Sequence, residues 1–496
     1  MLRIVRAFWH DQRGMALILV SITLPAIIGF SLLVIDMSRA NSLHNDLQKG
    51  ADAFALATAA ELDGGPDAII RGDRALGTLV FNTYHFGDKA ADDPPGAETL
   101  ATAGVTRRYL RSIPADDSQP IAAGDVITDE VGDAGDARFV EVTVTPVGFS
   151  AIFPASFIGG TNGFNIGAIS VAGFNRAICE TVPMFMCNPF EGVSAGTGKT
   201  IQQAFAEGLT YSREFRILKV DSNPGPGNFG LLDNNLASLR DAFAIGTAGT
   251  CYNRDAVETK TGVTLGQVNS GLNVRFDLYS NSLKQEDENP LYRPATNVRK
   301  GAGKTSNCNK FVAATDGSAM GFPPGDNYDN STGMTDSTWY RSDYWTLNHS
   351  TPLPPIPSSS HPTSMTQPPS RYDVYKYEIA QSLVGDQSPN PSKESGVPAC
   401  YKGPEPTDSP DRRLITMAVV NCRADQSKIN GHTELRPDAY VSVFLTNPVQ
   451  KQDNSKDDED ATSNEKPISF EIVDVEGPLG NNTLDKLLRD EPQLYR

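Results

Sequence analysis

The most distinct pattern along the chain is an uncharged apolar run close to its start. Residues 15–35 contain no charged side chain, and Asp36 follows them. At 1.5 Å per residue, a helix of these 21 residues is roughly 31 Å long, which matches the hydrocarbon core of a bilayer. The pattern therefore predicts a transmembrane helix over residues 15–36, preceded by a short leader over residues 1–14.

A second apolar pattern continues beyond Asp36 with the period of a helix. Apolar side chains recur at steps of three and four residues, with polar side chains between them, at Leu43, Leu47, Ala51, Phe54 and Leu62. Two glycines and a proline at residues 64–66 end this pattern. The sequence thus predicts an amphipathic helical extension over residues 37–65, whose apolar stripe packs against a folded body.

The charges that flank the apolar run predict its orientation. The leader carries Arg3, Arg6 and Arg13 against the single Asp11, whereas the other flank has no excess of cations. Under the positive-inside rule the N-terminus stays in the cytoplasm and the rest of the chain is exported. A signal peptide cleaved after Ala40 is the alternative, although the apolar run is longer than the core of about 7–15 residues found in such peptides.

The chain beyond the helix contains patterns typical of strands. Apolar and polar residues alternate over residues 138–145, and residues 166–174 form a second β-rich run. With a helix expected over residues 66–84, we predict an α+β module over residues 66–178, in which the amphipathic helix lies against an antiparallel sheet.

Three further regions complete the predicted organisation. A β-rich middle region covers residues 179–350, with strands at 215–220 and 273–278 and a helix at 231–243. A segment rich in proline and serine follows as a linker or loop over residues 351–371. The C-terminal β-rich region covers residues 372–496, with strands at 414–420, 440–445 and 468–475.

The overall fold class predicted is therefore α+β. A long N-terminal membrane-spanning helix continues into an amphipathic helix, and a large β-rich exported region follows.

The charge balance excludes one class of partner. The formal net charge is −17 and the sequence pI is about 4.8. Nucleic-acid binding needs a basic surface that replaces phosphate counterions, so we expect no nucleic-acid partner.

The cysteines indicate an oxidising compartment. All six follow the apolar run, and no C-x-x-C pattern occurs. An even number of cysteines in an exported region predicts three disulfides, although six cysteines allow about 15 pairings. Our sequence-based pairing is sequential, joining Cys179 to Cys187, Cys251 to Cys308, and Cys400 to Cys422.

The start of the chain resembles the N-terminal segment of TadE/TadG-like proteins of Flp (Tad) pilus assembly. In that family an R-G pair, an apolar span with a proline, an aspartate, an arginine and an L-Q-x-x-A-D-A-x-A-L-A run follow in this order. The matching residues are Arg13, Gly14, Pro25, Asp36, Arg39, Leu47, Gln48, Ala51, Asp52, Ala53, Ala55, Leu56 and Ala57. The resemblance implies a non-enzymatic accessory protein in the inner membrane of a Gram-negative bacterium, with its body in the periplasm and with pilin or other Tad proteins as partners.

Two departures narrow the resemblance to one branch. Prepilins that are processed carry a glutamate five positions after the cleaved glycine, and here that position, counted from Gly14, is Leu19. The resemblance therefore favours the uncleaved TadG-related branch. Within it we expect the branch without a von Willebrand A domain, because phrases such as residues 187–191 and 273–277 resemble that branch. The D-x-S-x-S metal motif of the other branch is only half matched at Asp316, since it ends in Met320.

Small residues in the apolar run suggest how this helix meets its partners. Small side chains let two membrane helices approach closely, and proline can kink the lipid-embedded half. The helix-packing candidates are Pro25, Ala26, Gly29 and Ser31.

The alternative function is an anchored periplasmic serine hydrolase. Residues 192–196 match the G-x-S-x-G nucleophile pattern around Ser194, and Asp408 or Asp411 followed by His432 would supply the acid and the base. The chemistry also needs a strand that delivers the serine into a tight turn, but Asn188 and Pro189 interrupt the strand expected there. An exported adhesin is a third hypothesis, for which no aromatic groove is evident.

Other motifs carry no chemistry that we would assign. The G-K-T sequences at residues 198–200 and 303–305 lack the earlier glycine of a phosphate-binding loop. The acidic run at residues 453–465 lacks the glycine and glutamate of an EF-hand. We therefore predict no cofactor, no metal site and no catalytic residue.

Overall fold

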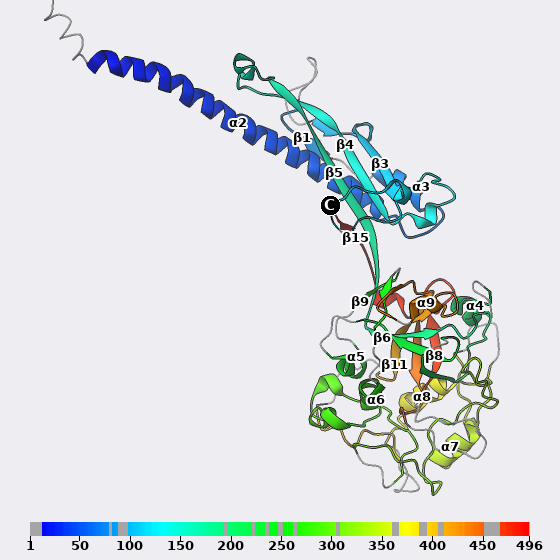
Figure 1. The fold of residues 1–496 in the computed structure, drawn as a ribbon. Coiled ribbons are helices and arrows are strands. Elements are labelled where there is room, and N and C mark those ends of the chain that lie inside the picture. Colours follow the sequence, from blue (N-terminus) through cyan, green and yellow to red (C-terminus); the bar gives the residue numbers. More distant parts are fainter. Residues whose placement is uncertain are drawn as a thin grey trace, which may run out of the picture. The chain divides into compact units, whose positions relative to one another are not determined.

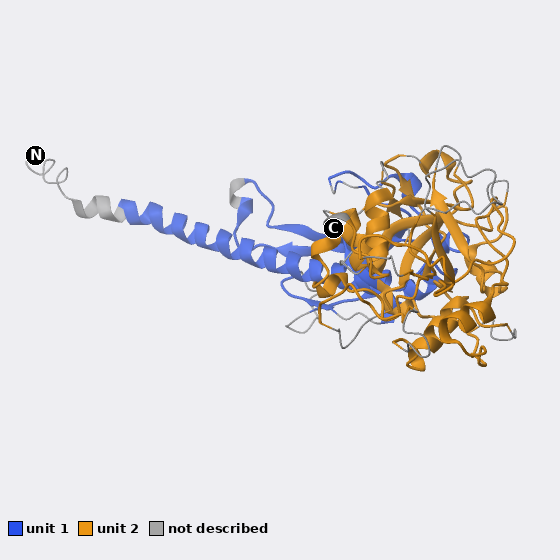
Figure 2. Ribbon diagram, turned by 90° about the horizontal axis from the view of Figure 1, so that it is seen from below, with its two compact units in different colours: residues 1–175, 490–496 blue, residues 176–489 orange. Residues whose placement is uncertain are grey.

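The computed structural model describes two compact units. It covers residues 12–495, with gaps at 79–81, 88–97, 115, 117, 193–196, 221–223, 234–237, 247–250, 255, 261–264, 304–307, 360–366, 386–393, 405–410, 430 and 451–466. Unit 1 comprises Met1–Asn175 and Asp490–Arg496, and unit 2 comprises Arg176–Arg489 (Figure 2). Unit 2 is thus inserted into the chain of unit 1.

A single long helix begins unit 1. Helix α2 covers Gln12–Ala59 and contains Pro25 (Figure 1). In its apolar half, the hydroxyls of Thr23 and Ser31 donate to the carbonyls of Leu19 and Ile27, each at 2.8 Å, so these polar groups are satisfied within the helix. The predicted continuation of the apolar helix into an amphipathic one is confirmed.

The sheet of unit 1 lies beside the C-terminal half of α2. Its order is β15-β5-β4-β3, and β4 pairs antiparallel with both β3 and β5. The bounds of these strands are Val105–Leu110 for β3, Phe139–Ser150 for β4, Gly163–Cys179 for β5 and Leu488–Leu494 for β15. Strands β4 and β5 contain the two predicted runs, whereas no sequence pattern predicted that β15 pairs with β5.

The core of unit 1 is the interface between α2 and the sheet. The predicted stripe is fully buried at Leu43, Leu47, Ala51 and Phe54, against Val140 and other side chains of the sheet. Helix α3 (Ala68–Thr78) packs beside α2. It is shorter than the predicted helix, whose last residues form a strand instead.

A short hairpin depends on a glycine in α2. Strands β1 (Asn82–Tyr84) and β2 (Glu98–Leu100) pair antiparallel, with Asn82 opposite Leu100. A side-chain carbon added at Gly50 would lie 2.5 Å from the Leu100 side chain and 2.8 Å from that of Asn82. Glycine therefore lets the hairpin approach the helix backbone.

A closed six-stranded barrel forms the centre of unit 2, in the order β11-β13-β14-β7-β8-β6. Two of its neighbouring pairs, β11 with β6 and β7 with β8, are parallel. The bounds are Thr181–Cys187 for β6, Phe215–Lys219 for β7, Asn228–Leu231 for β8, Leu414–Val420 for β11, Ala439–Leu445 for β13 and Ile468–Val475 for β14. The predicted middle and C-terminal regions thus contribute strands to one barrel, of which Figure 1 labels β6, β8 and β11.

The barrel interior is apolar and densely packed. Alternate residues of each strand face it, among them Met184, Met417 and Val441. The Phe215 and Phe470 rings stack inside it with centroids 5.7 Å apart. On the opposite face, Phe185 pairs with Gly230, and a side-chain carbon on Gly230 would lie 2.3 Å from the Phe185 ring.

Short elements surround the barrel. The helices are α4 (Ile201–Ala206), α5 (Leu239–Ile245), α6 (Leu265–Val274), α7 (Arg341–His349), α8 (Arg371–Ala380) and α9 (Gln426–Ile429). The remaining strands are β9 (Cys251–Asn253), which pairs with the end of β5, and β10 (Val257–Glu258), which pairs with β12 (Glu434–Leu435).

Two secondary-structure predictions for this region are wrong in part. Residues 273–278, predicted as a strand, contain the end of α6 and the turns after it. Residues 231–243, predicted as a helix, begin at the end of β8, and α5 starts only at Leu239. In both segments short apolar runs fit either kind of element, and packing around the barrel decides between them.

All six cysteines form disulfides, but the sequential pairing is wrong. The bonds join Cys179 to Cys251, Cys187 to Cys422, and Cys308 to Cys400. Cys179 and Cys187 cannot meet because β6 separates them, and a strand rises about 3.3 Å per residue. Cys187 instead lies opposite Val420 of the neighbouring strand β11, and Cys422 follows Val420 by two residues.

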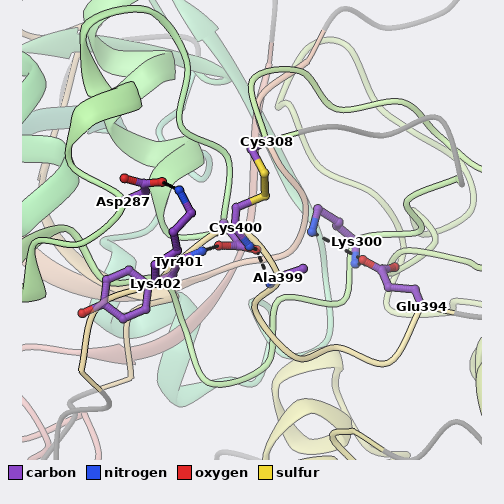
Figure 3. Close-up of a disulfide and its surroundings, with 9 residues drawn as sticks. Asp287, Lys300, Cys308, Glu394, Ala399, Cys400, Tyr401 and Lys402 are labelled. Atoms are coloured by element: carbon purple, nitrogen blue, oxygen red, sulfur yellow. Dashed lines mark hydrogen bonds and ion pairs between the residues drawn. A yellow bond between two sulfur atoms is a disulfide. The ribbon is translucent and has the colours of Figure 1, made fainter.

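Two carboxylates, of the buried Asp277 and the half-buried Glu394, hold the irregular segments near the third disulfide. Asp277 accepts hydrogen bonds from the backbone N–H groups of Ala399, Cys400 and Tyr401, at 2.6, 2.8 and 2.9 Å. Glu394 likewise accepts from three successive N–H groups, at residues 300–302. Figure 3 shows the Cys308–Cys400 bond together with Ala399, Tyr401, Lys300 and Glu394. Carboxylates and a disulfide here replace the hydrogen bonds of regular secondary structure.

The packing of the barrel core predicts that shortening one of its buried side chains greatly lowers the stability of the fold. Phe470→Ala should lower the free energy of unfolding by about 3–5 kcal/mol, because it removes a fully buried ring stacked on Phe215. Chemical unfolding of the full chain, followed by fluorescence of the buried Trp339 and Trp345, measures this loss.

The matched control is Leu291→Ala. This side chain is 54% exposed, so the change should stay within about 0.5 kcal/mol. Equal unfolding midpoints for the two variants would contradict the assignment of Phe470 to the core.

Candidate functional site

The N-terminal half of α2 presents an exposed apolar surface. Large side chains on every face of the helix, such as Leu19, Ile22 and Phe30, are solvent-exposed between Ile18 and Met37. Within the part of the chain that the structure describes, α2 is the helix long and apolar enough to cross a bilayer, with a mean hydropathy of 2.6 in its most apolar window. A helix that is apolar all round needs an apolar environment. This helix therefore indicates a single-pass membrane anchor.

Asp36 marks the point where α2 meets the sheet of unit 1. Its side chain is buried, and one carboxylate oxygen accepts from the backbone N–H of Phe153 at 2.6 Å. The other oxygen accepts from Arg39 at 3.1 Å. An unpaired carboxylate would be costly here, so these two donors allow the acid to be buried.

Arg39 connects Asp36 to the end of β4. Its guanidinium also donates to the carbonyl of Ser150 at 3.4 Å. It lies over the rings of Phe86 and Phe149, at 5.5 and 5.2 Å from their centroids. The arginine thus bridges the helix and the strand, through both its charge and its flat face.

Two further polar side chains of α2 contact β5. A ring nitrogen of His44 lies 3.2 Å from the carbonyl of Gly167, and Gln48 donates to the carbonyl of Ile169 at 3.0 Å. Gln48 also donates to Asp52 at 2.8 Å. Polar contacts with β5 therefore accompany the buried stripe and fix how α2 lies on the sheet.

These features define a class of protein in which one helix serves both as membrane anchor and as part of a folded body. Residues 14–61 match the family model described as Tad, Flp pilus-assembly TadE/G-like. The chain therefore carries a TadE/G-like Flp pilus-assembly domain at residues 14–61, and this match supports a role in Flp pilus assembly. No curated protein and no solved structure matches the chain.

The matched segment coincides with α2, and its pattern residues make the junction. Asp36, Arg39 and Gln48 provide the polar contacts described above. Leu47 and Ala51 belong to the buried stripe. The resemblance marked these residues in the sequence, but no pattern indicated that Phe153 would be the partner of Asp36.

The helix-packing candidates lie on the apolar half of α2. Pro25, Ala26 and Ser31 are exposed. Gly29 is half-buried and faces Phe153. The Phe153 ring lies 3.5 Å from the position that a side-chain carbon on Gly29 would take. Their use in helix packing stays a prediction.

The candidate residues of the hydrolase hypothesis do not contact one another where the structure describes them. Ser194 and Asp408 lie outside the described residues. Asp411 accepts from the Tyr375 hydroxyl at 3.0 Å and from the Arg413 N–H at 3.1 Å. His432 instead lies 3.2 Å from the Thr259 carbonyl and 3.6 Å from Glu258. The structure thus does not pair the predicted acid Asp411 with His432.

Three side chains of unit 2 have the spacing of metal ligands. Atoms of Asp233, Glu258 and His432 lie within 4.8 Å of one another, and sequence reasoning did not group them. Lys260 donates to Asp233 at 2.9 Å and already neutralises part of this charge. The acidic run at residues 453–465, considered for calcium, lies outside the described residues.

A cleft of unit 2 has a volume of about 720 Å³, and sequence reasoning did not find it either. Arg275, Lys376, Asp411 and Arg412 are among its lining residues. Arg275 is buried, and its Nη2 has no hydrogen-bond partner. The cleft therefore combines charges of both signs.

Removing the Asp36 carboxylate should loosen the junction. In Asp36→Ala the N–H of Phe153 loses its acceptor, so its hydrogen exchange should accelerate by about tenfold or more. Hydrogen–deuterium exchange on the full chain in lipid nanodiscs measures this change.

Asp46→Ala is the control, because it removes an acid of the same helix that lies near Lys49 and His85 rather than Phe153. Unchanged exchange at Phe153 in Asp36→Ala would show that the contact does not hold the junction.

A buried glutamate next to the G-x-S-x-G pattern predicts a pH dependence. Burial raises the pKa of Glu191 from its ordinary value of 4.5 to about 7, although the Arg423 N–H, at 3.2 Å, acts in the opposite direction. The folded state thus holds this proton more tightly than the unfolded chain. Ionisation of Glu191 therefore lowers stability progressively between pH 4.5 and about 7, and fully above that.

Glu191→Gln should remove this cost. We expect a gain of about 1–3 kcal/mol in the free energy of unfolding at pH 8 and none at pH 4. Urea unfolding at the two pH values tests this expectation. Glu207→Gln, which changes an exposed partner of Lys199, is the control, and equal effects of Glu191→Gln at both pH values would contradict the shift.

Proposed function

We propose that this protein is a membrane-anchored, non-enzymatic accessory protein that assembles or anchors the Flp/Tad pilus through protein–protein contacts. The observation that carries the proposal is the coincidence of the TadE/G-like segment with the exposed apolar helix and its junction. In this proposal the residues typical of the family hold the helix against the sheet and do not form a reactive centre.

The continuity of α2 supports a mechanical role. The helix runs without interruption from Gln12 to Ala59, and its second half forms part of the core of unit 1. A partner that contacts the lipid-embedded half therefore acts on the same rigid element that carries the sheet. The exposed Ala26 and Ser31 would allow another single-span helix to approach closely, with Pro25 shaping that half, whereas Gly29 faces Phe153 of the same chain.

The proposed location is the inner membrane of a Gram-negative bacterium. Three cationic side chains in the leader support a cytoplasmic N-terminus. Three disulfides in unit 2 support a periplasmic body, because such bonds persist in oxidising compartments. Partners in this setting are pilin subunits or other Tad assembly proteins.

Cross-linking mass spectrometry in pilus-producing cells tests the proposal. The wild-type chain should cross-link to pilin or to Tad assembly proteins. The double variant Ala26→Leu/Ser31→Leu should lose most links that involve α2, because larger side chains keep a neighbouring helix at a distance. The control Ile27→Leu changes an exposed apolar residue of the same segment without changing its size.

Two results would overturn the proposal. One is the absence of links to any pilus component in wild-type cells. The other is labelling by a serine-directed activity probe that disappears in Ser194→Ala, which would establish the hydrolase alternative.

A further inference from the structure

The hairpin of β4 and β5 extends along the apolar half of α2. Strand β4 ends at Ser150 and β5 begins at Gly163, and a short 3-10 helix (Ala155–Ile158) lies between them. In both views the end of this hairpin lies beside α2, beyond the rest of the sheet (Figures 1 and 2). We call residues 151–164 the hairpin tip.

The contacts of Phe153 place the hairpin tip along the helix axis. Its N–H binds Asp36, which ends the uncharged run, while its ring lies 3.5 Å from the position of a side-chain carbon on Gly29. Gly29 precedes Asp36 by seven residues, which corresponds to roughly 10 Å of helix. The hairpin tip therefore lies beside the apolar run and not beyond its end.

The composition of the hairpin suits an apolar environment. Residues 142–175 contain no charged side chain. Ile152 and Phe164 are each 53% exposed, at a position where a hairpin in water would carry polar side chains. These side chains continue the exposed apolar surface of α2.

The backbone of the hairpin tip satisfies many of its own polar groups. The N–H of Ala151 donates to the Asn162 carbonyl at 2.8 Å, and that of Gly160 donates to the Ala155 carbonyl at 2.9 Å. The Asn162 side chain accepts from the N–H of Ser156 at 2.9 Å. Groups paired internally cost less to remove from water, so the hairpin tip can enter a lipid interface.

We propose that the hairpin tip is a second membrane contact, which inserts Ile152, Phe153 and Phe164 into the leaflet from which α2 emerges. The inference rests on the proposed function, because it requires α2 to lie in a bilayer. Two contacts with the membrane stop α2 from rotating about its own axis. The face of the helix that points away from the hairpin tip, which carries the exposed Ser31, is then always offered to partners.

Site-specific fluorescence tests this contact. Since all six native cysteines form disulfides, single cysteines added to the full chain can be labelled selectively with the fluorophore NBD. The test variants are Ile152→Cys and Phe164→Cys. The control Val131→Cys adds a probe at a residue of unit 1 that is 81% exposed, and Phe30→Cys reports on the apolar half of α2.

The proteins are reconstituted in phosphatidylcholine nanodiscs with and without doxyl-labelled acyl chains. Doxyl lipid should quench the probes at residues 152 and 164 about twofold or more relative to the probe at residue 131, together with the probe at residue 30. Adding Ile152→Glu to the Phe164→Cys variant should reduce that quenching and leave the probe at residue 30 unchanged.

The probe at residue 30 separates failure of this inference from failure of the proposed function. Quenching at residue 30 with none at residues 152 and 164 would overturn the second contact alone. No quenching at residue 30 would overturn the membrane anchor and, with it, the proposed function. Protection of residue 152 from aqueous iodide only in cell membranes that contain pilus proteins would assign the hairpin tip to a protein partner and overturn the lipid contact.

Discussion

The structure of unit 1 depends on one continuous helix whose two halves have different surroundings. The first half is apolar on all sides and exposed, and the second half has a narrow stripe that is buried against the sheet. Asp36 lies at the change between them, where the Phe153 N–H and Arg39 satisfy its charge. A buried carboxylate tolerates few alternative arrangements, because any arrangement without these donors leaves an unpaired charge. This contact therefore fixes how far the helix extends beyond the sheet.

Unit 2 contains long segments with little regular structure, which are held in place in a different way. Its barrel provides the apolar core. Carboxylates hold the surrounding loops by accepting hydrogen bonds from the backbone N–H groups of those loops. Asp474 accepts from the N–H groups of Val475, Asn481 and Thr483, much as Asp277 and Glu394 do elsewhere. Glu471 similarly accepts from the backbone N–H groups of Arg371 and Tyr372, at 3.2 and 3.1 Å, and also from the Arg371 guanidinium at 2.6 Å. Because each acid has several donors, its burial fixes the local chain path.

The chain path also determines how the two units are joined. The chain leaves unit 1 after Asn175 and returns at Asp490, so unit 2 interrupts unit 1. The returning residues complete the first unit, since the Tyr495 N–H donates to the Val171 carbonyl at 2.8 Å and its ring meets that of Phe139 edge-on at 5.1 Å. The family match ends at residue 61. The match thus covers the apolar anchor and its amphipathic extension, while the sheet of unit 1 and all of unit 2 lie outside it.

The sequence by itself determined the features that depend on neighbouring residues. The uncharged run of residues 15–35, the stripe from Leu43 to Leu62 and the alternation in β4 all express a local period, so the anchor, its amphipathic extension and the main strands could be predicted. Only the tertiary structure decided which distant segments meet. Closure of the barrel placed Cys187 beside Cys422, packing set the true bounds of α5 and α6, and the β4–β5 turn supplied the donor for Asp36. Such pairings depend on global packing, which no local period encodes.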